Sequence, residues 1–132
     1  MNKGYYSISR NSNLVLLNNK SYNIFKKELQ LTNMEIDFFL IIINKGMMNL
    51  EQLSVNLGLD KSQCKKIIES LIIKNMIIEY STNVYETFHP RFAIINRYKR
   101  LCLENRIPLQ KNLLIDNLAN ALEKPFNAAR TK

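Results

Sequence analysis

The chain has 132 residues, of which 46% are hydrophobic and 23% charged, and its formal net charge is +8. This length suffices for one domain with a real core, and the composition excludes an intrinsically disordered chain. The positive charge favours a polyanionic partner, either nucleic acid or an anionic membrane surface. The longest apolar run, residues 38–43, is far shorter than the ~20 residues that span a bilayer, and no signal peptide opens the chain. We therefore expect a soluble cytoplasmic protein with no membrane partner.

Residues 1–30 are expected to form an N-terminal extension. Segments 5–9 and 14–17 could pair as a hairpin across the polar residues between them. A short helix capped by Ser21 is expected to follow. Its apolar face is formed by Ile24, Phe25 and Leu29.

The first strongly patterned helix begins after Thr32. Thr32 and Glu35 have the spacing of a capping box, in which each side chain satisfies a backbone N–H of the first turn. Residues 38–43 are apolar on every side, which predicts a helix in the centre of the core. Gly46 is expected to end it in the left-handed conformation that glycine tolerates.

A tight pair of helices follows. Asn49 can cap the first of them, and Gly58 stops it. Asp60 can cap the next helix, which is expected over residues 61–74. Two helices joined by so short a glycine-containing turn are the signature of a helix-turn-helix.

The helix over residues 61–74 has two different faces. The apolar positions recur at helical spacing and face inward: Cys64, Ile67, Ile68, Leu71 and Ile72. The open face carries Lys61, Ser62, Lys65, Lys66 and Glu69. Asn75 follows, and asparagine tolerates the left-handed conformation that closes a helix.

Segments 76–80 and 84–88 are rich in β-branched and aromatic residues, so they are expected to form a hairpin. The predicted fold is mainly α with a small β-hairpin, a winged helix-turn-helix over residues 31–90 with additional C-terminal helices. The hairpin, or wing, has no lysine or arginine, and Glu79 and Glu86 are expected to face each other across it. An acidic wing either does not touch DNA or meets another protein.

Residues 91–132 are expected to form the C-terminal helices. Pro90 suits the first turn of a helix over 91–105. Its apolar stripe is Ile94, Ile95, Tyr98, Leu101 and Cys102, and its other side carries Arg97, Arg100 and Glu104. The arginines are either a solvated face or contacts to phosphates flanking a DNA groove.

A last helix is expected over residues 110–123 and is ended by Pro125. Its apolar positions are Leu114, Ile115, Leu118, Ala121 and Leu122. This stripe either closes the core or pairs with a second copy of the chain. We expect pairing, and hence a homodimer, because symmetric sites are commonly recognised by dimers.

Residues that catalyse reactions or bind metals are sparse. The chain has one histidine, His89, which is expected to be structural, and two cysteines, Cys64 and Cys102, which are expected to be buried. The sequence contains no Cys/His cluster, phosphate-binding glycine loop or nucleophile elbow. We therefore expect no enzymatic activity, no metal and no cofactor.

Several short patterns carry a likeness to a known family: Leu31-Thr32-x-x-Glu35, Gly46, Leu50-x-x-Leu53-x-x-x-Leu57-Gly58-Leu59, Leu71-x-x-Lys74-Asn75-Met76-Ile77 and Tyr85-x-x-x-His89-Pro90-Arg91. With them, residues 31–91 resemble the winged-helix domains of archaeal transcription regulators, the TrmB-like family in particular. Asn75 stands where that family usually has glycine. The resemblance implies a dimer that binds DNA and regulates transcription. It places Lys61, Ser62, Gln63, Lys65 and Lys66 on the recognition helix.

The sequence thus predicts a homodimer that binds double-stranded DNA with the helix over 61–74 in the major groove. The expected DNA contacts are Lys61, Ser62, Gln63, Lys65, Lys66, Arg97 and Arg100. For the lysines, the alternative is a solvated helix face. For the whole protein, one alternative is a protein-interaction module of the transcription machinery. The other is a non-specific nucleic-acid or chromatin binder, whose binding depends on salt and little on sequence.

Overall fold

The structure is a computed structural model that describes residues 19–131. Within this part of the chain the fold is mainly helical, with a small antiparallel sheet of three strands. The elements in chain order are α2 (Asn19–Glu28), α3 (Asn33–Lys45), β1 (Met48–Asn49), α4 (Leu50–Leu57), α5 (Lys61–Ile73), β2 (Ile77–Ser81), β3 (Val84–Thr87), α6 (Pro90–Glu104) and α7 (Leu113–Ala128). The hairpin expected over residues 5–9 and 14–17 lies outside the described residues.

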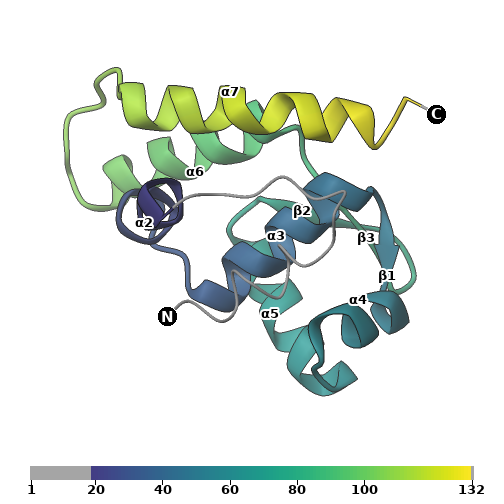
Figure 1. Ribbon diagram of the computed structural model, residues 1–132. Coiled ribbons are helices and arrows are strands. Elements are labelled where there is room, and N and C mark those ends of the chain that lie inside the picture. Colours follow the sequence, from purple (N-terminus) through teal and green to yellow (C-terminus); the bar gives the residue numbers. More distant parts are fainter. Residues whose placement is uncertain (1–18, 132) are drawn as a thin grey trace.

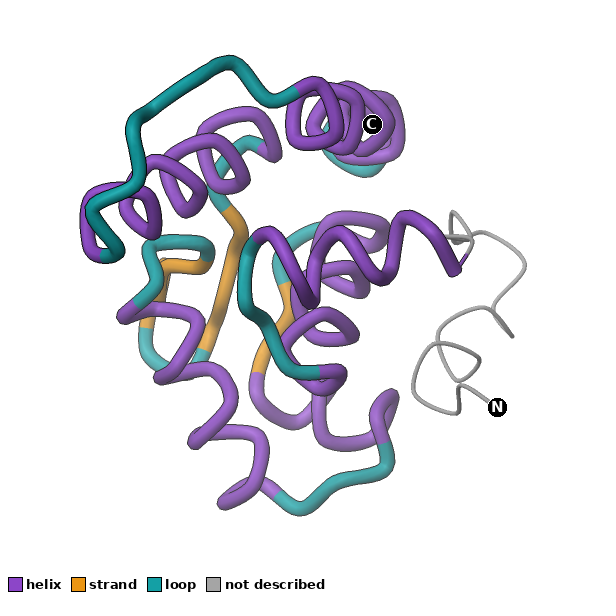
Figure 2. The backbone as a smooth tube through the Cα atoms, turned by 90° about the vertical axis from the view of Figure 1, so that its left-hand side faces the viewer, coloured by secondary structure: helices purple, strands orange, loops and turns teal. Residues whose placement is uncertain are grey.

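Figure 1 shows α7 lying across one side of the molecule with α6 against it, α3 in the middle, and α4 and α5 on the opposite side. In Figure 1, β1 and β3 lie beyond one end of α3, and in the view of Figure 2 helices flank the strands on both sides. α2 packs against α3 and α7. Among residues 19–131, no helix is both long and apolar enough to cross a bilayer.

The short helix expected near the start of the chain is present as α2. It begins at Asn19, two residues before the expected cap, Ser21. Phe25 and Leu29 are buried, and the ring of Phe25 meets the ring of Phe39 edge-on at 6.1 Å. These contacts make α2 part of the core around α3.

α3 forms the centre of the core because its sequence is apolar on nearly every side. All of residues 35–43 are buried, and the predicted Thr32–Glu35 capping box is present. The end of the helix differs from the expectation. Gly46 has φ 90° and ψ −169°, so its φ is positive but it is not in the left-handed helical conformation. The extended ψ leads the chain onward into β1.

Residues 58–60 join α4 to α5. Gly58 has φ 67° and ψ 33°, the left-handed conformation predicted for it. A capping box begins each helix, formed by Asn49 with Gln52 and by Asp60 with Gln63. Asn75 has the expected positive φ, 62°, at the end of α5. The two helices therefore keep the short connection that the sequence predicts.

The predicted hairpin is confirmed as β2 and β3, and β1 pairs with the free edge of β3. The sequence does not predict β1, because two residues are too few to show an alternating pattern. Met48 of β1 lies opposite the buried Tyr85, a pairing that depends on the tertiary fold. Strand order is β1-β3-β2, so β2 is an edge strand.

The register of the hairpin corrects one expectation. Glu79 lies opposite Tyr85, and Glu86 lies opposite Ile78, so the two glutamates do not face each other. The two glutamates belong to successive pairs of the ladder, and successive side chains of a strand point to opposite faces, so Glu79 and Glu86 lie on opposite faces of the hairpin. The register also shifts between Glu79 and Ser81, near the turn.

α6 begins at Pro90, and His89 caps it by accepting a hydrogen bond at Nδ1 from the backbone N–H of Arg91 at 3.1 Å. The imidazole of His89 also meets the ring of Phe126 edge-on, with centroids 5.1 Å apart. These contacts give His89 a structural role. Both cysteines are buried with free thiols, as expected.

α7 is longer than expected, because Pro125 lies inside the helix and does not end it. A proline cannot donate a hydrogen bond to the carbonyl four residues earlier, which here belongs to Ala121. Ala121 is exposed, so water can satisfy that carbonyl. Phe126, one residue beyond the proline, packs against the core and stabilises the extra turn.

The apolar face of α7 closes the core of its own chain. Its buried residues are Ile115, Leu118, Ala119 and Leu122. They belong to the same cluster as the buried residues of α2, α3 and α6. Of the two roles left open for this helix, these residues perform the first: they pack within one chain and form no exposed stripe for a second copy. Leu114 and Ala121 remain exposed beside the buried face.

Candidate nucleic-acid interface

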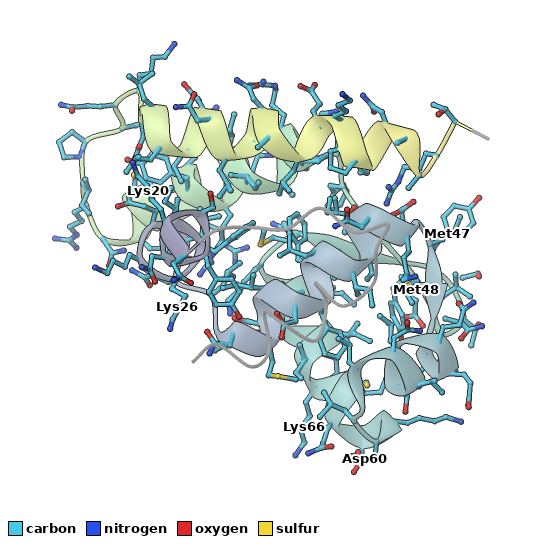
Figure 3. All side chains as sticks on the ribbon, viewed as in Figure 1. Lys20, Lys26, Met47, Met48, Asp60 and Lys66 are labelled. Atoms are coloured by element: carbon cyan, nitrogen blue, oxygen red, sulfur yellow. The ribbon has the colours of Figure 1, made fainter. Side chains whose placement is uncertain are left out.

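α5 presents a polar face to solvent while its other face packs against α3 and α4. Lys61, Ser62, Gln63 and Lys66 are exposed, and Lys65 is half-buried. In Figure 3, Lys66 points away from the body of the molecule at its lower edge, close to Asp60 at the start of the helix. Most residues expected to contact DNA therefore do share one accessible surface.

Lys61 is paired with α4. Its Nζ lies 2.7 Å from Glu51 Oε1, and both side chains are more than half exposed. Ion pairs so open to solvent contribute little, about 0–1 kcal/mol. Lys61 can therefore exchange Glu51 for a phosphate at small cost in free energy.

Gln63 is largely committed to the start of its own helix. The Asp60 backbone N–H donates to Gln63 Oε1 at 3.2 Å, and the Gln63 backbone N–H donates to Asp60 Oδ1 at 2.8 Å. Only the side-chain N–H₂ of Gln63 is left to contact a base or phosphate. This double use makes Gln63 a weaker candidate for a DNA contact than Ser62.

Lys65 connects α5 to the hairpin. Its Nζ donates to Asn83 Oδ1 at 3.4 Å, at the turn between β2 and β3. It also lies beside the Tyr85 hydroxyl: burial and the Glu79 carboxylate raise the pKa of Tyr85, and the Lys65 ammonium partly offsets this rise. Lys65 therefore lies at the junction of helix and hairpin.

Lys66 is an exposed and unpaired cation of this surface. Within residues 19–131 it has no ion pair or hydrogen bond, and its side chain is exposed. A lysine without a protein partner keeps its full charge for an incoming phosphate.

The carboxylates of the hairpin are engaged within the protein. Glu79 accepts a hydrogen bond from the backbone N–H of Asn83 at 2.8 Å, which closes the turn. Glu86 forms an ion pair with Arg130, with Nη2 2.5 Å from Oε1. The acidity that counted against DNA contact in the sequence is thus partly neutralised by Arg130.

Arg97 corrects a site prediction. It is only 7% exposed, and its Nε donates to the backbone carbonyl of Leu29 at 3.0 Å. Burial lowers the pKa of this guanidinium, although Glu104 and Glu35 favour its charged form. Because the side chain is buried between α6 and the segment after α2, it cannot reach a phosphate.

Arg100 lies nearer the surface but is also engaged. Its Nη1 donates to the carbonyl of Ile73 at 2.7 Å, and its Nε lies 3.4 Å from Glu104 Oε2. The carbonyl of Ile73 is one of those at the C-terminal end of α5 that lack a partner within the helix. Arg100 thus holds the far end of α5.

A buried polar cluster fixes α5 to α3. Glu35 accepts hydrogen bonds from the Ser70 hydroxyl and from Lys74 Nζ, the latter at 2.5 Å. Burial opposes ionisation of Glu35, but these bonds and the backbone N–H of Thr32 outweigh it and lower its pKa. Sequence reasoning treats Glu35 as a capping residue alone and misses this second function.

No group of three or more histidine, cysteine, aspartate or glutamate side chains suited to a metal ion occurs in the described part of the chain. The chain was also compared with family models, curated proteins and solved structures, and none of them matched.

Proposed function

We propose that this protein binds double-stranded DNA as a winged helix-turn-helix, with α5 as recognition helix and the β2–β3 hairpin as wing. The order α3–β1–α4–α5–β2–β3, with the three-residue turn between α4 and α5, supports this assignment. By occupying sites on DNA the protein would regulate transcription, as the resemblance to TrmB-like regulators implies.

The observation that carries the proposal is the environment of α5. Its apolar face is buried, its ends are held by Asp60 and Arg100, and its exposed face presents Ser62 and the unpaired Lys66. A rigidly held helix with an open cationic face suits insertion into a groove lined by phosphates.

The first experiment measures fluorescence anisotropy of a labelled AT-rich duplex, including the gene's own upstream region, across a salt series with random competitor DNA. We expect binding that survives competitor and weakens with salt. Lys66→Ala should weaken binding about tenfold and reduce the salt slope by about one. Lys124→Ala, which removes the same charge from α7 on the opposite side, should change neither.

Other outcomes of the anisotropy experiment would favour a different function. Binding that competitor abolishes supports the non-specific nucleic-acid binder. Absence of binding by the unaltered protein at low salt rejects both DNA-binding proposals.

A second candidate is a protein-interaction module. β2 is an edge strand, and its side chains Ile78 and Tyr80 are 36% and 65% exposed. Exposed apolar side chains beside unpaired backbone groups can accept a strand from another protein. This candidate predicts that Tyr80→Lys abolishes capture of the partner and leaves DNA affinity unreduced.

A further inference from the structure

We propose that Arg130, in the turn that follows α7, is a positioning residue that holds the wing in place for DNA binding. This inference rests on the proposed function. The wing itself supplies no cation, so its placement depends on residues from other elements.

Arg130 contacts the wing through the carboxylate of Glu86. Nε of Arg130 donates to Glu86 Oε2 at 3.1 Å, and Nη2 donates to Glu86 Oε1 at 2.5 Å. Both side chains are 19% exposed. A two-pronged arginine–carboxylate pair shielded from water fixes direction as well as distance.

Arg130 also contacts α3 and α7. Nη1 of Arg130 donates to the carbonyls of Ile43 and Phe126 at 2.9 Å, and Nη2 donates to the carbonyl of Ile42 at 3.0 Å. The guanidinium also lies over the Phe126 ring, 3.8 Å from its centroid. One side chain thus joins β3 to α7 and to the end of α3, whose last carbonyls carry partial negative charge.

The wing is in turn connected to α5, the proposed recognition helix, through Lys65. Glu86 and Tyr85 are neighbours on β3, and β3 leads back to the turn at Asn83, where Lys65 of α5 makes its contact. Arg130 therefore holds the base of the wing and Lys65 holds its tip. Releasing the base should let the wing move relative to α5.

Substitution of Glu86 distinguishes positioning from simple charge repulsion. If Glu86 acted only as a negative charge near DNA, Glu86→Gln would tighten binding. If Glu86 anchors the wing, Glu86→Gln should weaken binding although the variant is more positive. Glu69→Gln is the comparison for charge alone, because it removes the same charge from the exposed face of the proposed recognition helix, and it should tighten binding.

The experiment compares the unaltered protein with Glu86→Gln, Arg130→Gln, the double variant and Glu69→Gln by anisotropy with one duplex. We expect each single substitution to weaken binding about fivefold, and the double variant to be no weaker than Arg130→Gln, because the pair acts as a unit. Arg130→Lys should not restore affinity, since one ammonium cannot replace the planar fork.

Hydrogen exchange without DNA provides a readout independent of binding. The amides of residues 84–88 should exchange faster in Glu86→Gln and Arg130→Gln, while those of α5 stay protected. Unchanged exchange, or tighter DNA binding by Glu86→Gln, would overturn the positioning role while leaving the proposed function intact. If the unaltered protein binds no DNA, the proposed function itself fails.

Discussion

At the scale of single residues, two carboxyl groups on α3 lie two positions apart in opposite electrostatic environments. Asp37 is 1% exposed, with the Tyr22 hydroxyl 3.4 Å from its Oδ1. Burial raises the pKa of Asp37 to about 7, although the hydrogen bond from Tyr22 acts in the other direction. Glu35 has its pKa lowered despite burial, because Lys74, Ser70 and Thr32 all donate to it. The two groups should therefore give stability opposite dependences on pH.

For Asp37, the pKa in the folded state lies above the unfolded value of about 3.9. Its contribution to stability is full below the unfolded pKa and is lost as pH rises toward 7. Asp37→Asn should abolish this loss and raise the free energy of unfolding by about 3 kcal/mol at pH 8. Urea unfolding from pH 4 to pH 8 measures it, with Asp116→Asn on α7 as control. An unaltered pH profile in Asp37→Asn would exclude the effect.

For Glu35, the sign reverses. Its contribution is present above the unfolded pKa and is lost as pH falls through the lowered folded pKa. Glu35→Gln leaves the Lys74 ammonium without its carboxylate partner and should reduce the free energy of unfolding at pH 7 by about 2 kcal/mol. The same urea titration tests this, and the loss should shrink toward acid pH. A loss that is equal at all pH values would contradict the role of the charge.

At the scale of elements, two glycines end helices in different ways. Gly58 is left-handed, with nothing within 4 Å of an added Cβ, so Gly58→Ala should cost only the conformational preference, about 1 kcal/mol. Gly46 combines φ 90° with an extended ψ, a region essentially restricted to glycine. Gly46→Ala should therefore cost more, about 2–3 kcal/mol. Thermal unfolding of the two variants compares them directly, and equal losses would refute the distinction.

Local signals predict most of the elements. The capping boxes at Thr32, Asn49 and Asp60 mark the starts of α3, α4 and α5, because the interactions involved span three residues. The prediction that Pro125 ends the last helix is wrong, because the packing of Phe126 compensates for the penalty of proline in a helix. Only the tertiary fold provides that packing. β1 is not predicted either, because its pairing with β3 also depends on the tertiary fold.

The candidate site is less predictable than the fold. The open face of α5 follows from periodicity, but the partners of Lys65 and Glu86 come from segments that only the fold brings together. Arg97 is different, since its spacing of three from Ile94 and four from Leu101 places it on the apolar stripe. That spacing could have predicted its burial.

At the scale of the whole molecule, the homodimer expected from the sequence needs a surface other than the buried stripe of α7. Exposed apolar side chains cluster in sequence around the loop between α6 and α7: Leu103, Ile107, Leu109, Leu113 and Leu114. Such side chains mark an interaction site where they form a contiguous patch. If the chain dimerises, this loop is the surface that we expect it to use.

Light scattering after size exclusion tests this expectation. The molar mass of the unaltered protein should be twice the 15.5 kDa of one chain. The double substitution Leu113→Glu and Leu114→Glu should reduce this molar mass to that of a monomer. Val55→Glu, at an exposed apolar position on α4, is the matched control and should remain dimeric. A monomer in the unaltered protein rejects the expected dimer.

The contacts of Arg130 also bear on the order of events during biosynthesis. Arg130 follows Glu86 by 44 residues and Ile42 by 88 residues, so the wing and α3 leave the ribosome before the group that joins them. At ordinary elongation rates the interval after Glu86 is roughly several seconds. A nascent chain would thus contain α5 and the wing before the residue that anchors the wing. If the protein binds DNA as proposed, it should reach its full affinity only after Arg130 has left the ribosome and paired with Glu86.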